Sequence, residues 1–267
     1  MTTGSDFRRA RFVVSYRGTA FRGAAESPGV RTVIGDLRAA CEQIFGTPVD
    51  FTLAGRTDAG VHAVGQVISC DIPVTADPKD LAHRLTRMCG PDIAVRSGEW
   101  AEGDFNARFS ASSRSYRYHV WNSPTGNPLL GDLTWHIPQA LDLEKMNESA
   151  SAVVGQHDFS SFCRAPDPAP DGSPMSLVRT VLTAHWATAE PSQLVTFDIT
   201  GLAFCHQMVR SLVGTMADIG VGRFQPHEMA EILEAKDRQQ AGRVAPPQGL
   251  VLMKVGYDRT SSKDGVQ

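Results

Sequence analysis

The sequence predicts an α+β protein made of two ferredoxin-like (split βαβ) units, with a mostly antiparallel sheet, helices on one face and an active-site cleft between the units. Two observations predict this fold. Strand and helix patterns follow the order βαββαβ in the first half and βαββααβ in the second. Strand segments also alternate apolar and polar residues, which is typical of a sheet with one buried face. We place the two predicted domains at 1–105 and 106–267.

The first half contains its strand and helix signals in a clear order. Thr32 is a capping residue at the start of a predicted helix, and Gly46 is a stop signal at its end. Asp77 and Pro78 start a second helix. A turn that contains Asp58 joins the second and third strands. The four predicted strands are 11–16, 49–54, 64–68 and 92–96.

The second half adds two long helices, one short helix and a proline-rich segment. Asp142 caps the first helix, and an apolar stripe over 209–219 predicts the second, with a short helix following at 227–233. The segment 163–176 contains four prolines and is predicted to be a loop that either connects two elements or contacts a substrate. The predicted strands are 107–121, 177–186, 194–200 and 250–257.

Composition limits the class of protein. The 267 residues are 42% hydrophobic, which is ample for a core. No apolar run approaches the roughly 18 residues needed to span a bilayer, and the N-terminus lacks a secretory signal, so we expect a cytoplasmic protein with no membrane partner. The five cysteines show neither a CxxC pair nor zinc-ligand spacing. We therefore expect reduced thiols and no structural metal.

Basic residues are unevenly distributed, although the net charge is only −3. Arginine supplies 21 of the 26 basic residues, and six of these arginines lie within the first 31 positions. The planar guanidinium suits phosphates and base edges better than an ammonium does, which favours a nucleic-acid partner. The alternative explanation for the excess of arginine is a bias of the genome toward arginine codons.

The segment 53–67, LAGRTDAGVHAVGQV, presents a single carboxylate, Asp58, between an arginine and a glycine. The residues alone are consistent with an ordinary turn, in which Asp58 has no chemical role. The segment lacks the GxxxxGK[ST] spacing of a phosphate loop, and the chain contains no GxSxG elbow. Nucleotide triphosphatase and serine hydrolase functions are therefore unsupported.

Three segments in order carry a family resemblance: 55–63 (GRTDAGVHA), 107–118 (ARFSASSRSYRY) and 203–214 (AFCHQMVRSLVG). Together they make the chain similar to the TruA-type tRNA pseudouridine synthases over about residues 11–257. The resemblance implies isomerisation of uridine to pseudouridine, at positions 38 to 40 of the tRNA anticodon arm, by a homodimer that needs no cofactor. It favours a route in which the ribose is the electrophile.

The resemblance also assigns roles to four residues. Asp58 is expected to be the nucleophile. Tyr116 is expected to stack on the uracil and pass a proton, although its place on an alternating strand also fits a core aromatic. Arg210 is expected to keep Asp58 ionised, the alternative being an ordinary surface arginine. Arg56 is expected to replace the flipped nucleotide in the RNA helix.

Other polar residues of the three segments are expected to have supporting roles. Arg108 and Arg114 are weaker candidates for phosphate contacts. We expect His62 and His206 to support the backbone and the packing, because no third residue completes a metal site or a catalytic triad with either.

The chain departs from its family where RNA is expected to bind. Tyr16-Arg17-Gly18 stands where the family usually has Tyr-Asp-Gly, and Gly23-Ala24-Ala25 stands where it has Gly-Trp-Gln. Leu85-Thr86-Arg87-Met88-Cys89-Gly90-Pro91-Asp92 stands where the family tends to have Leu-Asn followed by Leu-Pro-x-Asp. These changes leave open a catalytically weak RNA-binding or RNA-folding protein on the same scaffold. A third possibility is an isomerase of free nucleosides.

Overall fold

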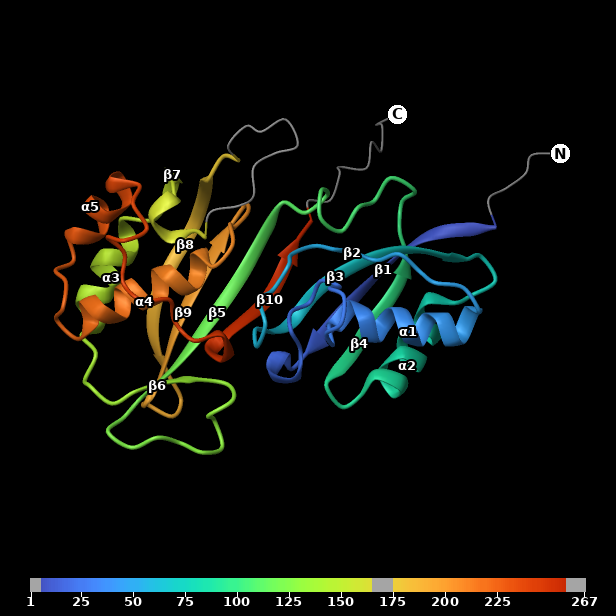
Figure 1. Cartoon of the computed structure of the whole chain (residues 1–267), viewed down its shortest axis with the longest axis horizontal. Coiled ribbons are helices and arrows are strands. Elements are labelled where there is room, and N and C mark those ends of the chain that lie inside the picture. Colours follow the sequence, from blue (N-terminus) through green and yellow to red (C-terminus); the bar gives the residue numbers. More distant parts are fainter. Residues whose placement is uncertain (1–5, 165–174, 258–267) are drawn as a thin grey trace, which may run out of the picture.

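The described residues, 6–164 and 175–257, form one ten-stranded sheet in the computed structural model (Figure 1). The strand order is β4-β1-β3-β10-β5-β9-β8-β7, with β2 beside β3 and β6 beside β5. Within these residues only the pairs β10 with β3 and β5 with β6 are parallel. The predicted α+β class with a mostly antiparallel sheet is therefore confirmed.

The first half of the chain follows the predicted order of elements. Thr32 caps α1 by accepting a hydrogen bond from the Gly35 backbone N–H, and Gly46 ends the helix with a left-handed φ of 74°. Asp77 caps α2 in the same way. The elements are β1 (Phe7–Tyr16), η1 (Gly18–Ala20), α1 (Val33–Phe45), β2 (Thr52–Leu53), β3 (His62–Pro73), α2 (Pro78–Cys89) and β4 (Ile93–Trp100).

The second half contains the predicted helices and two short strands that periodicity did not predict, β6 and β7. The strand predicted over 107–121 begins only at Ser113, because 107–112 is irregular and Asn106 caps a turn there. The elements are β5 (Ser113–Asn122), β6 (Trp135–Ile137), α3 (Leu143–Ser151), β7 (Gly155–Asp158), η2 (Ser160–Phe162), β8 (Val178–Ala189), β9 (Leu194–Gly201), α4 (Met208–Gly220), α5 (Glu228–Ala235), η3 (Pro247–Gly249) and β10 (Leu250–Gly256).

The final strand joins the two halves. β10 pairs in parallel with β3, Val251 opposite His62, and antiparallel with β5, Leu252 opposite Tyr116. It therefore lies in the middle of the sheet, although it is last in the sequence. This pairing brings the start of β3, which follows the Asp58 turn, close to the strand that carries Tyr116.

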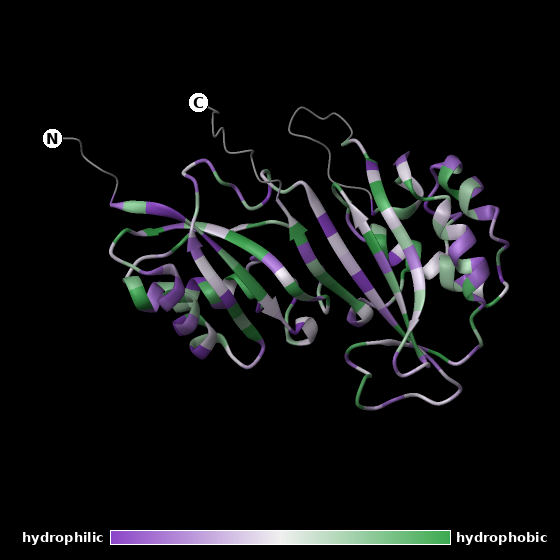
Figure 2. Ribbon diagram, turned by 180° about the vertical axis from the view of Figure 1, so that it is seen from behind, coloured by the Kyte–Doolittle hydropathy of each residue, from purple (hydrophilic) through white to green (hydrophobic). Residues whose placement is uncertain are grey.

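Side-chain burial shows which face of the sheet is covered. On β1, Ala10, Phe12, Val14 and Tyr16 are buried, while the residues between them are partly exposed. In Figure 1, α1 and α2 lie over the first half of the sheet, and α4 lies over the second half. Figure 2, viewed from behind, shows no helix in front of the central strands. The helices therefore share one face, as predicted, and the other face is open.

Candidate active site

One buried glutamine of the sheet holds the turn that carries Asp58. Gln66 of β3 is fully buried; its Nε2 donates to the Gly55 carbonyl at 2.7 Å, and its Oε1 accepts from the Gly55 N–H at 3.3 Å. The same amide donates to the hydroxyl of Tyr16, which also bonds Thr57 Oγ1 at 2.7 Å. Both residues next to Arg56 are thus held by the sheet. The sequence signal for this role is a glutamine flanked by apolar residues, in Val64-Gly65-Gln66-Val67-Ile68.

A second support comes from the segment 17–32, which lies against the back of the turn. The Ala24 N–H donates to the Thr57 carbonyl at 3.1 Å, and the Gly18 N–H donates to Nδ1 of His62 at 3.0 Å. A Cβ at Gly18 would collide with the carbonyl oxygen of Val61, so only glycine allows this approach. Ala24 is fully buried. Ala24 occupies the position where the family usually has tryptophan, and it packs against the turn.

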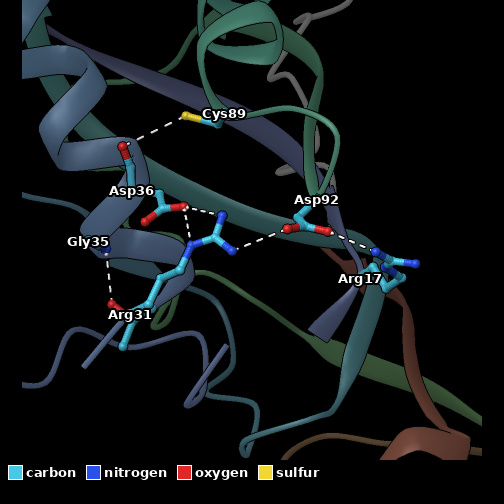
Figure 3. Close-up of polar contacts among 7 residues, drawn as sticks. Arg17, Arg31, Gly35, Asp36, Cys89 and Asp92 are labelled. Carbon is cyan, nitrogen blue, oxygen red and sulfur yellow. Dashed lines mark hydrogen bonds and ion pairs between the residues drawn. The ribbon is translucent and has the colours of Figure 1, made fainter. Parts of the chain in front are cut away.

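An ion network anchors the same segment to the rest of the first half (Figure 3). Arg31 binds Asp36 at 2.8 Å and Asp92 at 3.2 Å, and the other oxygen of Asp92 accepts from Arg17 at 3.2 Å. The Asp92 side chain is only 14% exposed, and its carboxylate pairs with two guanidinium groups in this partly desolvated position. Arg17, which replaces the family's aspartate, is thus tied to the start of β4.

His62 has a structural position, as the sequence predicted. It is buried, and its Nδ1 accepts from Gly18, so the proton is on Nε2, which donates to the Asp132 carbonyl at 3.0 Å. Burial lowers the pKa of His62, which favours this neutral form. The imidazole therefore connects the segment 17–32 with the loop that contains Asp132.

Arg210 of α4 lies directly against Asp58. Its Nη1 donates to Asp58 Oδ2 at 2.9 Å, and its Nε donates to the Ala245 carbonyl at 2.8 Å. The side chains of Arg210 and Asp58 are 13% and 25% exposed, so the charges meet in a partly dehydrated position. Because the guanidinium is held on two sides, it has one orientation toward the carboxylate.

His206 occupies the other carboxylate oxygen. Its Nε2 lies 3.2 Å from Asp58 Oδ1, and its side chain is 47% exposed. The sequence predicted that His206 supports the backbone and the packing, and it did not predict this contact with Asp58. The sequence signal was weak, because His206 precedes α4 by two residues and its contact with Asp58 depends on how the two halves meet.

Tyr116 lies on the buried face of β5, close to the same turn. Its ring meets Phe204 edge to face at 5.2 Å, and a Cβ at Gly55 would lie 3.5 Å from its hydroxyl. This hydroxyl makes no hydrogen bond within residues 6–164 and 175–257, and it does not belong to their fully buried unpartnered atoms. Burial raises the pKa of Tyr116, so the phenol keeps its proton at neutral pH.

Arg56 and two other arginines differ in their surroundings. Arg56 is exposed, and within the described residues it makes no hydrogen bond or ion pair with Asp58. Arg108 is exposed and stacks on Phe109. Arg114, in contrast, donates to the carbonyls of Ala54 at 3.0 Å and Leu202 at 2.8 Å, and burial lowers its pKa. Its guanidinium ties the two halves together and is less available to a phosphate.

The cysteines differ from the sequence-based expectation at one pair. Cys163 and Cys205 form a disulfide with Cα atoms 5.8 Å apart, while Cys41, Cys70 and Cys89 are free and buried. The expectation of five reduced thiols is therefore wrong, because folding brings the end of η2 beside the start of α4. Of the segment 163–176, residues 165–174 lie outside the described residues, so its predicted contact with substrate is not addressed.

Residues 6–164 and 175–257 lack two further features. They contain no group of three or more histidine, cysteine, aspartate or glutamate side chains that is arranged to hold a metal ion. No helix in these ranges has the length and apolar character needed to cross a membrane. The site is thus defined by one carboxylate, two cationic or neutral nitrogen donors and one phenol.

Comparison with known proteins gives the family. Residues 150–258 match a family model described as tRNA pseudouridine synthase. The chain is 39% identical over 252 residues to tRNA pseudouridine synthase A of Geobacillus sp. (strain WCH70), covering 94% of this chain and 99% of the relative. It is 38% identical over 253 residues to the enzyme of that name from Bacillus subtilis (strain 168), with the same coverage. For Hyphomonas neptunium the identity is 40% over 254 residues, covering 93% and 98%. The chain therefore belongs to the tRNA pseudouridine synthase family.

Proposed function

We propose that this chain isomerises uridine to pseudouridine in tRNA, with the Asp58 carboxylate as nucleophile. Membership of the family supports the reaction. The observation that supports the site most directly is the contact of Asp58 with Arg210 at 2.9 Å, beside a buried tyrosine whose hydroxyl is unpartnered among the described residues. A carboxylate, a fixed guanidinium and a protonated phenol are sufficient for an isomerisation that gains and loses no atoms.

The proposed reaction follows from these groups. A carboxylate oxygen of Asp58 attacks C1′ of the ribose, the N1–C1′ bond breaks, and its electron pair leaves with the uracil. The uracil turns, C5 bonds to C1′, and the carboxylate is released as its oxygen leaves C1′. Loss of the C5 proton and protonation of N1 complete the isomer. Arg210 places a positive charge against the carboxylate in a site that bound substrate dehydrates.

Tyr116 and Arg56 are proposed to act on the flipped nucleotide. The ring of Tyr116 lies at the buried side of the site, where an extruded uracil would stack, and its hydroxyl is free to donate or relay a proton. Arg56 is exposed two residues before Asp58, a position from which a long cation is able to enter the RNA stem and bond to the bases left behind. No cofactor takes part in this scheme.

The finer features of the function are proposed from the resemblance. The target uridines are those at positions 38 to 40 of the anticodon arm, bound by a homodimer in the cytoplasm, where tRNA is available. The units 1–105 and 106–267 are proposed to form the two sides of the site, because Asp58 comes from one and Arg210, His206 and Tyr116 come from the other. Sedimentation of the purified protein at several concentrations tests the dimer.

The test of the function is an assay on tRNA that lacks pseudouridine. The intact protein and Asp58→Asn are compared for isomerisation at each uridine and, in parallel, for tRNA affinity. The matched control is Asp104→Asn, which changes an exposed aspartate. We expect the intact protein and the control to form pseudouridine, and Asp58→Asn to bind tRNA without turnover.

Two results would contradict this proposal. Binding of tRNA by the intact protein with every uridine unchanged would favour an RNA-binding or RNA-folding function. Turnover of free uridine or its phosphate, without turnover of tRNA, would favour a nucleoside isomerase.

A further inference from the structure

His206 is a second partner of Asp58, and it differs in kind from Arg210. The imidazole Nε2 lies 3.2 Å from Oδ1, whereas the guanidinium of Arg210 bonds Oδ2 at 2.9 Å. The two side chains therefore contact different oxygens of one carboxylate, Arg210 through a hydrogen bond and His206 through an ion-pair contact. Arg210 is 13% exposed and His206 is 47% exposed, so His206 is on the solvent side of Asp58.

The backbone of His206 is held firmly although its side chain is half exposed. Its carbonyl accepts from the Arg164 N–H at 3.0 Å, and the preceding Cys205 is joined to Cys163. The following Gln207 has φ 65° and ψ 1°, a left-handed conformation that costs a residue with a side chain on the order of 1 kcal/mol. This conformation turns the chain between His206 and α4.

Two donors on one carboxylate have a geometric consequence. Rotation about the Cβ–Cγ bond of aspartate is soft, so a single hydrogen bond on one oxygen leaves the plane of the carboxylate poorly defined. A second donor that reaches the other oxygen fixes that plane. Each carboxylate oxygen has about two lone-pair positions, so each keeps one that is available for attack.

We propose that His206 is a positioning residue for the reaction, in which the imidazole, 3.2 Å from Asp58 Oδ1, turns its Nε2–H onto that oxygen when substrate binds and fixes the plane of the nucleophilic carboxylate for attack. This inference rests on the proposed function. It requires the hydrogen on Nε2, which a neutral imidazole supplies as well as a charged one. His206 is thereby assigned to the nucleophile, and no proton transfer to the substrate is assigned to it.

A hydrogen bond that orients a nucleophile acts mainly on turnover. Loss of one bond to a charged group, together with looser alignment, is expected to lower kcat by about 10-fold to 100-fold. The affinity for tRNA comes mostly from phosphate contacts elsewhere on the surface, so KM should stay within about twofold. A role in packing alone would instead change stability and leave kcat intact.

The experiment compares four proteins on tRNA that lacks pseudouridine: intact, His206→Leu, His206→Gln and the control His83→Leu. His83 is an exposed histidine of α2. The amide nitrogen of glutamine takes approximately the place of Nε2 and keeps the donor. We expect His206→Leu to lose kcat as stated, His206→Gln to stay within about threefold of the intact protein, and the control to be unchanged. Thermal unfolding midpoints should agree among all four.

Three results would overturn the proposal while the intact enzyme remains active. These are unchanged kcat in His206→Leu, an effect confined to KM, or equal losses of kcat in His206→Leu and His206→Gln. Absence of isomerisation by the intact protein would be a different failure, because it would reject the proposed function itself. Should His206→Leu unfold, the comparison of kcat between His206→Gln and the intact protein still decides, since a loss beyond about threefold in a folded variant contradicts the donor role.

Discussion

The guanidinium of Arg210 bonds the carboxylate of Asp58 at 2.9 Å across 152 positions of sequence. Neither residue is near the other along the chain, and each is held by its own half of the molecule. Gln66 fixes the turn that carries Asp58, and the Ala245 carbonyl fixes Arg210. The site therefore exists only when both halves share one sheet.

Replacing Arg210 by glutamine should lower kcat by about 100-fold, because Asp58 loses its cationic partner in a partly dehydrated site. Arg210→Lys should restore only part of the activity, since an ammonium lacks the fork that reaches both Asp58 and Ala245. Single-turnover rates with saturating enzyme measure the effect. The control is Arg223→Gln, which removes the ion pair between Arg223 and Asp218; the Arg223 side chain is 60% exposed. Equal rates for Arg210→Lys and the intact enzyme would contradict the fixed-fork role.

Two neighbouring tyrosines of β5 should respond differently to loss of the hydroxyl. Tyr118→Phe removes a bond to the Pro246 carbonyl at 2.7 Å and should lower the free energy of unfolding by about 1 to 2 kcal/mol, with little effect on turnover. Tyr116→Phe should lower turnover about tenfold or more with little effect on stability, because its hydroxyl has no partner among the described residues. Urea unfolding and the isomerisation assay together distinguish the two. The reverse pattern would reject the proposed role of Tyr116.

Gln66→Leu should destabilise the fold by about 3 kcal/mol, because both backbone groups of Gly55 and the Tyr16 hydroxyl lose a buried partner. The turnover of the folded fraction should fall as well, since the Asp58 turn loses its support. Urea unfolding monitored by tryptophan fluorescence measures the first effect. Gln139→Leu, at an exposed site, is the matched control. A variant as stable as the intact protein would mean that the amide does not fix the turn.

Stability should decrease as the pH falls below about 6.5, the ordinary pKa of histidine. Burial lowers the pKa of His62 and of His119. In this pH range the unfolded chain therefore binds more protons than the folded one, so the free energy of unfolding decreases as the pH is lowered. The slope is at most about 1.4 kcal/mol per pH unit for each histidine. Urea unfolding between pH 7.5 and 5.5 measures it. In His62→Gln the slope should be smaller, and an unchanged slope would show that His62 does not contribute.

Cysteine labelling should distinguish the two disulfide-bonded cysteines from the three free, buried cysteines. Burial raises the pKa of Cys41 to about 12 and that of Cys89 to about 11, and it also raises the pKa of Cys70, so these protonated thiols should not react in the native protein. Iodoacetamide should add no label before mild reduction and two labels after it, as read by intact mass. Two labels without any reductant would show that Cys163 and Cys205 are reduced in solution.

Local chemistry explains why much of the fold was predictable. Thr32, Gly46, Asp77 and Asp142 are capping or stop residues whose effect depends on a few neighbouring backbone groups, and the structure places helix ends at all four. The alternation along β1 predicted one covered face. The short strands β6 and β7 span three and four residues, too few for a periodic signal.

Long-range pairing explains most of what could not be predicted. Nothing in the residues of β10 indicates that the last strand pairs with β3 and β5 in the middle of the sheet. Strands pair through backbone hydrogen bonds, which depend little on the residue types involved. The contact of His206 with Asp58 and the pairing of Cys163 with Cys205 could not be predicted for the same reason. Their partners are close only after the two halves have joined.

The sequence by itself determined the helix boundaries, the buried face of the sheet and the three segments that resemble the family, because caps, periodicity and motifs are local properties of the chain. Only the tertiary structure decided that Oδ2 of Asp58 meets Arg210 and that Oδ1 meets His206. Those contacts depend on the relative position of two halves joined through one central strand. That position is set by the summed packing and hydrogen bonding of the whole sheet, which no single segment encodes.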